Sequence, residues 1–219
     1  MVTQQQIQQF AEYCERHLDF SISAPPGYSS APICALDSVF SIGIRYTIVV
    51  SSIYRFCQLI KQNFETSTIT TSEVLNIIDK ISDDELAEQY LTKHRTSTKN
   101  GILKVTAFRL FLQTMQTYHV ETCDDIHSIA GNSAFENAIK LIPGQRCGIT
   151  LDYLYILSKM ENYVKDDRHI KSFINDVFPL NNFIHNDRIE LVQKTALELS
   201  RGKYPSMTPR HLDHLIWNY

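Results

Sequence analysis

The stretch IKLIPGQRCGITLDYLYILSKMENYVKDDRHIKSF, residues 139–173, decides how the rest of the chain is organised. An apolar pair, Leu141 and Ile142, ends one helical pattern, and another begins near Ile149 after the tight turn of 143–148. Proline fixes one backbone angle and glycine permits positive φ, so this turn can be short and bare. The first amides of the second helix have no intrahelical partner, so this helix start favours an anion.

A third helix is expected to begin within the polar segment DDRHIK, residues 166–171. The turn, IPGQRCGIT over 142–150, and this later segment together resemble the helix-hairpin-helix DNA glycosylases, the endonuclease III-like superfamily. In that family the hairpin runs roughly L-P-G-V-G-x-x-T-A and is followed by a V-D-T-H-x-x-R segment. The resemblance places Asp167 on the catalytic aspartate and His169 on the usual histidine. Asp166 takes the aspartate's place if the helix start shifts by one residue.

Two hairpin positions depart from the family pattern. Arg146 replaces the second glycine, and Gly148 occupies the position where bifunctional members carry their Schiff-base lysine. The resemblance therefore implies a monofunctional glycosylase without lyase activity, because a lysine nucleophile must have its amine at the sugar carbon. No iron–sulfur cluster is expected, since residues 173–219 contain no cysteine. No metal site or other cofactor is predicted; the one ion that the resemblance allows is a monovalent cation at the hairpin.

The resemblance implies three groups of site residues. The catalytic group is Asp167, whose charge would stabilise an oxocarbenium-like transition state and orient the attacking water. The alternative for Asp167 is a helix N-cap, a role that suits aspartate. The DNA-binding group is Pro143, Gly144, Gln145, Arg146, Gly148, Thr150, Lys104, Arg168 and Lys171. The group expected to form the base pocket or a wedge is Asp37, Ser41, Ile42, Gly43 and Arg45.

The wedge prediction concerns the segment 35–46, an apolar helix that ends in a serine-containing turn. An apolar Ile42 could fill the space of an extruded base, as intercalating side chains do elsewhere. The alternative is a core helix with a local kink at Gly43. Lys104, which follows Asn100 and a glycine, resembles a lysine of that family that lies near DNA or packs at the helix start; a solvated lysine is the alternative.

The composition is that of an ordinary globular protein of 219 residues, enough for one compact domain or two lobes sharing a core. No apolar run approaches the roughly 20 residues that a membrane span needs. Met1 is followed by polar, Gln-rich sequence, so no secretory signal is expected. The five cysteines are scattered and odd in number, which favours free thiols in a reducing cytoplasm.

Charge is unevenly distributed along the chain, whose formal net charge is −3. Residues 89–120 and 137–151 contain no Asp or Glu but several Lys and Arg. This segregation predicts one basic face on a mildly acidic molecule, as a DNA-binding protein needs. The alternative is a chance run of solvated cations.

The chain is predicted to be nearly all helix, because apolar residues recur at helical spacing. The β-branched residues 48–50 suggest a strand, but their long apolar context favours a buried helix. The pair His211 and His214 has no further ligand nearby, which favours packing over metal binding. Helices are expected over 3–17, 34–61, 71–81 with Ser72 as cap, 83–92, 102–118, 123–129, 133–141, from 149, over 166–177 and 187–200, and from Thr208.

The resemblance thus implies an all-α, two-lobed helix-hairpin-helix glycosylase fold with its active site in the cleft between the lobes. Residues 34–160 would form the central lobe ending in the hairpin, and 1–33 plus 161–219 the second lobe. The implied function is a monomeric, cytoplasmic, nucleoid-associated enzyme that flips a damaged or modified base out of double-stranded DNA and excises it. The alternatives are a non-catalytic hairpin protein that binds DNA and an all-helical interaction protein. Small residues at Ser41, Gly43 and Gly148 raise the hypothesis of a roomy pocket for a modified base of phage DNA.

Overall fold

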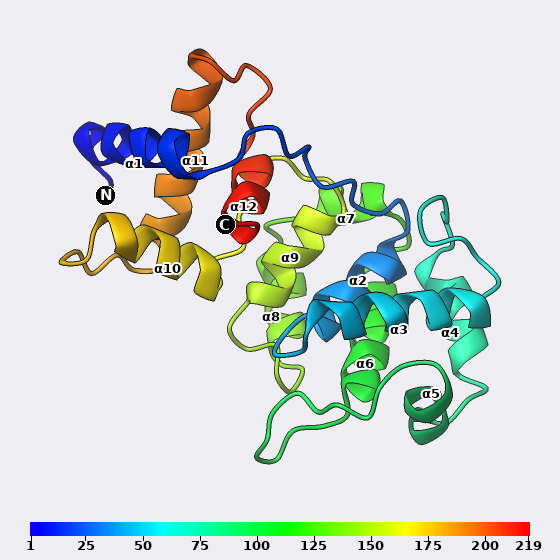
Figure 1. The fold of residues 1–219 in the computed structure, drawn as a ribbon. Coiled ribbons are helices and arrows are strands. Elements are labelled where there is room, and N and C mark those ends of the chain that lie inside the picture. The colour runs from blue at the N-terminus through cyan, green and yellow to red at the C-terminus, as the bar shows by residue number, and fades with distance from the viewer. The chain divides into compact units, whose positions relative to one another are not determined.

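The computed structural model describes residues 1–219 and confirms the all-α prediction (Figure 1). One isolated antiparallel bridge, between Arg95 and Leu103, is the only β contact. The chain folds into two compact units: a terminal unit of residues 1–26 and 160–219, and a central unit of residues 27–159. The helices are α1 (Gln4–His17), α2 (Ala31–Phe40), α3 (Tyr46–Leu59), α4 (Thr71–Ile78), α5 (Asp83–Gln89), α6 (Lys104–Thr117), α7 (Cys123–Ile129), α8 (Ser133–Lys140), α9 (Ile149–Leu157), α10 (Arg168–Val177), α11 (His185–Arg201) and α12 (Pro209–Trp217).

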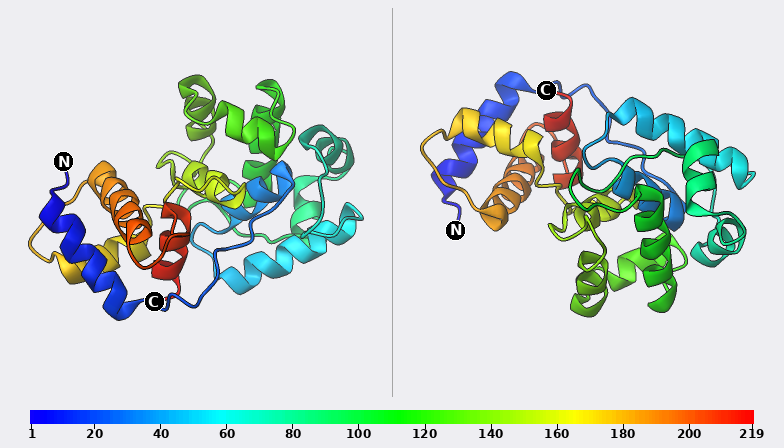
Figure 2. Two further views of the ribbon diagram at one scale, coloured as in Figure 1. Left: turned by 90° about the horizontal axis from the view of Figure 1, so that it is seen from above. Right: turned by 90° about the horizontal axis from the view of Figure 1, so that it is seen from below.

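The central unit is built around α2, whose ten residues are all buried. A helix without a solvent-facing side must be enclosed by neighbours, and α2 packs against α3, α4, α6 and α9 (Figure 2). Phe56 of α3 meets Phe108 of α6 edge to face, with ring centroids 5.6 Å apart. These neighbours hold α2 in place and so determine the position of the turn 41–45 at its C-terminal end.

The terminal unit is held by an aromatic core. Phe10 of α1 contacts Phe173 of α10 edge to face at 5.6 Å and Phe178 at 6.3 Å. Helix α1 packs along α11, and α12 packs against α10 and α11. The two ends of the sequence therefore build one core, with α1 supplying a face that α10–α12 lack on their own.

Several helix boundaries refine the sequence prediction. The long apolar stretch 34–61 divides into α2 and α3, with Gly43 at φ +70° in the break. The β-branched residues 48–50 are helical, so the preference for a helix over a strand is confirmed, but α3 is buried on one side only, and of these three residues only Val49 is buried. Ser72 does not cap α4; Thr70 does, in a capping box with Glu73. Thr208 caps α12 as expected, and the bounds of α7 coincide with the predicted 123–129.

None of the helices combines the length and the apolar character needed to cross a membrane.

Candidate functional site

The predicted hairpin is a pair of consecutive tight turns between α8 and α9. Gln145 N–H donates to the Ile142 carbonyl at 2.9 Å, and Gly148 N–H donates to the Gln145 carbonyl at 3.2 Å. Gly144 has φ +92° and Gly148 has φ +81°, both in the left-handed region that favours glycine. The two glycines therefore make the turn possible, and Gly148 directly precedes α9 as its N-cap.

The turn also packs closely on another loop. A Cβ atom on Gly144 would lie 2.5 Å from the Cβ of Thr96, a distance that real side chains do not reach. A Cβ on Gly148 would lie 3.4 Å from Cε of Lys140, so that lysine stem covers this glycine. Glycine at 144 is thus required twice, by backbone angle and by space.

Two residues predicted to bind DNA turn their side chains inward. Gln145 and Thr150 are almost fully buried, and the Thr150 hydroxyl donates to the Gln145 side-chain oxygen. This hydrogen bond ties the middle of the turn to the first turn of α9. These side chains brace the hairpin from inside. Because the backbone N–H and carbonyl of Gln145 are also paired within the turn, only the open amide of Thr150 is left for the predicted contact with DNA.

The outer side of the hairpin is open. A hollow of about 740 Å³ lies against it, and Arg146 is exposed there without an ion-pair partner. The amides of Ile149 and Thr150 have no acceptor within the chain, and Gly148 supplies no side-chain cap. Unpaired amides at a helix start next to a free guanidinium favour a bound anion. The lining residues are Asn137, Lys140, Leu141, Ile142, Pro143, Gly144 and Arg146.

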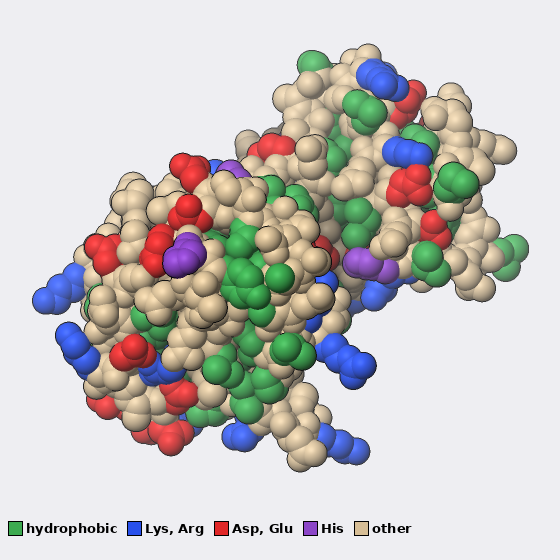
Figure 3. All heavy atoms as spheres, turned by 180° about the vertical axis from the view of Figure 1, so that it is seen from behind, with side chains coloured by type: hydrophobic (Ala, Val, Ile, Leu, Met, Phe, Trp, Pro, Cys, Tyr) green, Lys and Arg blue, Asp and Glu red, His purple; other side chains and the backbone are tan.

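The wider basic face is weaker than the acid-free stretches predict. Lys93 pairs with Glu88 at 2.9 Å, and Arg109 bridges to Asp79 at 2.7 Å and Asp83 at 2.9 Å. Two cations within 89–120 are thus paired, Lys93 with an acid five residues away and Arg109 with acids 26 and 30 residues away, and Figure 3 shows acidic as well as basic side chains on the face it displays. These ion pairs reduce the positive charge of this stretch, and the basic face stays a prediction.

Lys104 is a buried residue rather than a phosphate contact. Its Nζ donates to the carbonyls of Val39 at 2.7 Å, Phe40 at 3.3 Å and Ile42 at 2.6 Å. These carbonyls lie at the end of α2 and would otherwise lack partners. Burial lowers the pKa of Lys104 to about 8. Lys104 therefore holds the turn after α2 in place. This agrees with the expectation that it packs at the helix start, and it speaks against both a direct DNA contact and a solvated lysine.

The turn after α2 has an open tip and a buried polar base. A Cβ added to Gly43 would meet nothing within 4 Å, and Arg45 is exposed at the N-cap of α3 without a side-chain capping bond. The Ile42 side chain is half-buried, so it projects only in part. This turn is exposed enough to meet a ligand, and its backbone is fixed from below.

The base of that turn is a cluster around Asp37, which is fully buried. Tyr28 donates its hydroxyl to Oδ2 of Asp37 at 2.9 Å, and Ser41 donates to Oδ1 at 2.6 Å. Burial, then Asp37 itself, raises the pKa of Tyr46 to about 12. The pKa values of Tyr28 and Tyr153 are raised by the same causes in the same order. The cluster therefore combines one carboxylate with a set of neutral hydroxyl donors.

Asp166 is locked into an ion pair inside the terminal unit. Its side chain is 2% exposed; both oxygens accept from Arg188 at 2.6 Å, and Oδ2 also accepts from Nδ1 of His185 at 2.7 Å. Burial works against the charged form, but the hydrogen bonds from Arg188 and His185 outweigh it and lower the pKa of Asp166. A carboxylate held this way positions α11 against the start of α10.

Asp167, the predicted catalytic residue, is the N-cap of α10. Its Oδ1 accepts from the amides of His169 at 2.8 Å and Ile170 at 3.4 Å. Its Oδ2 lies 3.8 Å from Nζ of Lys165, and the side chain is partly exposed. The alternative role as a cap is thus realised, and one carboxylate oxygen remains outside the cap. The predicted phosphate contacts Arg168 and Lys171 are exposed on the same helix.

The histidines of the predicted segments have packing roles. His169 lies beside Trp217, with ring centroids 6.3 Å apart. Nε2 of His211 is 2.8 Å from the Ile22 carbonyl, and His214 stacks on Trp217. The structure contains no group of three or more His, Cys, Asp or Glu side chains arranged for a metal ion.

The sequence prediction missed His185, Arg188, Tyr28 and Tyr153. The partners of Asp166 follow it by 19 and 22 residues, in a helix whose apolar pattern carries no sign of them. Tyr28 follows the Pro-Pro-Gly breaker and looked like ordinary loop sequence. A buried acid such as Asp37 inside an apolar run was the one available signal, because such an acid needs donors nearby.

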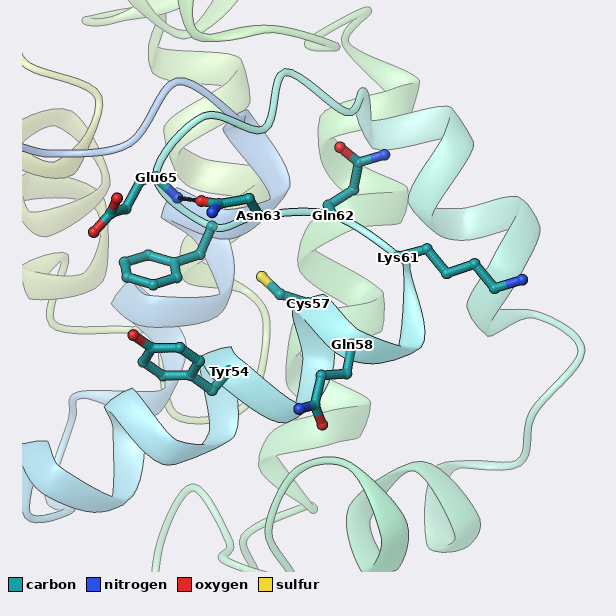
Figure 4. Close-up of a pocket in the computed structure, with 8 residues that line it drawn as sticks. Tyr54, Cys57, Gln58, Lys61, Gln62, Asn63 and Glu65 are labelled. Atoms are coloured by element: carbon teal, nitrogen blue, oxygen red, sulfur yellow. Dashed lines mark hydrogen bonds between the residues drawn. The ribbon is translucent and has the colours of Figure 1, made fainter.

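A second hollow, of about 420 Å³, lies at the end of α3 (Figure 4). The rings of Tyr54 and Phe64 meet edge to face at 4.8 Å on one side of it. The Asn63 side chain is engaged within its own loop, accepting from the amide of Glu65 at 2.8 Å, and Lys61 points away. This arrangement gathers no reactive groups, so we assign the hollow no role.

The chain belongs to the family described as "Domain of unknown function (DUF8548)", whose model matches residues 8–219. No curated protein and no solved structure matches the chain. The family match spans both compact units, so the hairpin and the segment 166–171 lie within one family domain.

Proposed function

We propose that the protein is a monofunctional DNA N-glycosylase that excises a damaged or modified base and leaves an abasic site. The observation that carries the proposal is the hairpin. Two left-handed glycines expose the unpaired amides of Ile149 and Thr150, and Arg146 stands free beside an open hollow. This combination suits a backbone phosphate, and a phosphate contact positions a protein on DNA without reading sequence.

In the proposed mechanism the hairpin holds the strand while the target nucleotide leaves the base stack. The turn 41–43 would fill the vacated space, with Ile42 as its apolar side chain and Arg45 beside it. Lys104 supports this role indirectly, because its three carbonyl contacts keep the turn rigid as it presses on DNA. Arg168 and Lys171 add exposed positive charge for phosphates.

Asp167 is the proposed catalytic carboxylate. Breaking the glycosidic bond generates an oxocarbenium-like sugar, and a nearby negative charge lowers the energy of that state. The cap geometry supports this choice over Asp166: the helix amides fix Oδ1 of Asp167 and leave Oδ2 outside the cap, whereas Arg188 and His185 occupy both oxygens of Asp166. A fixed carboxylate needs no reorganisation during the reaction.

The proposal assigns the two compact units to the two lobes of the glycosylase fold. It describes a monomer that acts on double-stranded DNA in the cytoplasm. In the proposal the partly exposed hydroxyls of Ser41 and Tyr28 would line the base pocket and hydrogen-bond the edge of a base, and the buried Asp37 would orient them. A modified base of phage DNA and a damaged cellular base are the two substrate classes to be compared.

The test is to incubate the purified protein with phage genomes carrying different modified bases and with DNA carrying deaminated or alkylated bases, and to count abasic sites. We expect abasic sites in at least one of these DNAs. A protein that binds DNA with a steep salt dependence but forms no abasic site on any of them is a non-catalytic hairpin protein instead. Absence of DNA binding at low salt would point to an interaction protein.

A further inference from the structure

The hydroxyl cluster in the central unit is built around a side chain that accepts hydrogen bonds and donates none. Asp37 is fully buried in α2, and an ionised carboxylate carries no proton of its own. Tyr28 donates its hydroxyl to Oδ2 of Asp37 at 2.9 Å, and Ser41 donates to Oδ1 at 2.6 Å. Both carboxylate oxygens therefore receive a hydroxyl proton, which compensates for the burial of the charge.

The hydrogen bonds to Asp37 decide what the two hydroxyls can offer to a ligand. A hydroxyl combines one proton to donate with two lone pairs that accept. Because the proton of Tyr28 and that of Ser41 both point at the carboxylate, lone pairs are what these hydroxyls present to a group that approaches from outside. The buried charge thus makes both of them acceptors toward a ligand.

A neighbouring tyrosine extends the cluster without changing this polarity. Burial, followed by Asp37, raises the pKa of Tyr46 to about 12, so its phenol keeps its proton at neutral pH. A neutral hydroxyl that joins such a network donates towards the carboxylate and again turns its lone pairs outward. Tyr46 is 40% exposed, and Tyr28 and Ser41 are partly exposed, so the outer side of the cluster is within reach of a ligand.

We propose that this cluster selects a base with an exocyclic amino group over a base with a carbonyl oxygen at the same position. The inference rests on the proposed function, in which the edge of the flipped base meets Ser41 and Tyr28. An amino group supplies the proton that an acceptor needs, whereas a carbonyl oxygen would bring lone pairs against lone pairs. A site built to hydrogen-bond one group rejects an analogue that leaves its polar groups unpaired. The substrate class is therefore the amino-bearing bases, that is, modified forms of adenine or cytosine.

Asp37→Asn tests this polarity directly, because asparagine has the same shape but one donor end. Its amide nitrogen donates to the hydroxyl that it faces, so that hydroxyl turns its proton outward and offers it to a carbonyl oxygen. The variant should therefore lose the preference for an amino group. Tyr28→Phe and Ser41→Ala remove the two acceptors one at a time. Tyr54→Phe changes an exposed tyrosine outside the cluster and is the matched control.

The experiment measures binding of the full-length protein to three duplex DNAs that differ in one unpaired base. The base is adenine, purine, which lacks the amino group, or hypoxanthine, which has a carbonyl oxygen in its place. We expect adenine to be bound about tenfold more tightly than either of the others, by the wild type and by Tyr54→Phe. In Asp37→Asn the three affinities should agree to within about twofold, and the ratio should also fall in Tyr28→Phe and Ser41→Ala.

Two results would overturn the inference. One is that the wild type binds the three duplexes equally or prefers hypoxanthine. The other is a preference for adenine that persists in all three cluster variants, since it would then arise elsewhere. Circular dichroism establishes that each variant is folded, and if Asp37→Asn is unfolded, Tyr28→Phe and Ser41→Ala decide.

The same measurement separates this inference from the proposed function, because binding requires no excision. A preference for adenine without abasic sites on any DNA contradicts the glycosylase and leaves the amino-selective cluster standing. Abasic sites without a preference in binding contradict the cluster and leave the glycosylase standing. No binding to any of the three duplexes at low salt contradicts both.

Discussion

The start of α9 and the start of α10 solve the same problem in opposite ways. Both helices begin with amides that lack intrahelical acceptors. At α10 the chain provides its own anion, since Asp167 accepts from the amides of His169 and Ile170. At α9 the cap is Gly148, which offers no side chain, and the amides stay open beside Arg146. One helix start is already filled by a carboxylate, and the other is left for an external anion.

Under the proposed function, the two helix starts would make different contributions. The open start of α9 is suited to a phosphate, because its amides and the helix dipole both favour negative charge. The closed start of α10 cannot take an anion, but it displays a fixed negative charge that suits a developing cation. The predictions that follow test each half of this contrast, beginning with the largest expected effect.

Removing the charge of Asp166 should destabilise the terminal unit far more than removing that of Asp167. Asp166→Asn leaves Arg188 partly buried without its counter-ion, a change that typically costs about 3–5 kcal/mol. Asp167→Asn should change the free energy of unfolding little, because asparagine caps a helix about as well as aspartate. Urea unfolding followed by Trp217 fluorescence reports on this unit, since it contains the only tryptophan. Equal destabilisation by Asp166→Asn and Asp167→Asn would contradict the assignment of Asp166 as a structural ion-pair residue and Asp167 as a cap.

The hairpin turn should be intolerant of a Cβ atom at Gly144. Gly144→Ala adds backbone strain of roughly 1–3 kcal/mol and, in addition, a clash with Thr96. Gly131→Ala is a matched control, because Gly131 has φ +81° but nothing within 4 Å of a Cβ. Urea unfolding followed by circular dichroism should show the larger loss for Gly144→Ala. If the two losses are equal, the turn is not packed on the loop around Thr96.

Acid should weaken the terminal unit through Asp166. Its folded-state pKa lies below the unfolded value, so its stabilisation is present above the unfolded pKa of about 3.9 and is lost as the pH falls through the folded value. The wild type should therefore lose stability on acidification more steeply than Asp166→Asn between about pH 5 and pH 2. Parallel curves of unfolding free energy against pH for the two proteins would contradict this role.

Arg146→Glu should weaken DNA binding by about tenfold at low salt. It should also lower the slope of log affinity against log salt concentration by about one, the contribution of one phosphate contact. Lys99→Glu makes the same charge change in an exposed loop cation of the central unit and serves as the control. Titration of labelled duplex DNA at several salt concentrations measures both quantities. The same loss in both variants would show a general charge effect and remove the special role of the hairpin.

The sequence predicted local features well and long-range ones poorly. Pro143, Gly144 and Gly148 predicted the turn, because the fixed φ of proline and the conformational freedom of glycine are properties of single residues. The partners of Lys104 escaped prediction, because its acceptors are carbonyls more than 60 residues earlier in the chain. The positive charge of the stretch 89–120 was overestimated for the same reason, because Arg109 forms ion pairs with Asp79 and Asp83, which lie outside the stretch.

In the candidate site, too, the local motifs were predicted and the long-range partners were not. The resemblance identified Asp167 and the hairpin as motifs, but it could not separate Asp166 from Asp167. That separation rests on Arg188 and His185, which reach Asp166 from another helix. Likewise, Asp37 was noted as a pocket residue, while the tyrosines that surround it come from three other segments of the central unit.

The most direct test of the central claim is the single-turnover rate at which Asp167→Asn excises a base, measured on the DNA from which the wild type excises bases fastest. The account predicts a rate lower by about 10²–10³, because a preorganised charge at the transition state is lost. DNA affinity and unfolding free energy should stay near the wild-type values, so the loss would belong to chemistry alone. Excision by Asp167→Asn at the wild-type rate would contradict the account and leave Asp167 as a helix cap only.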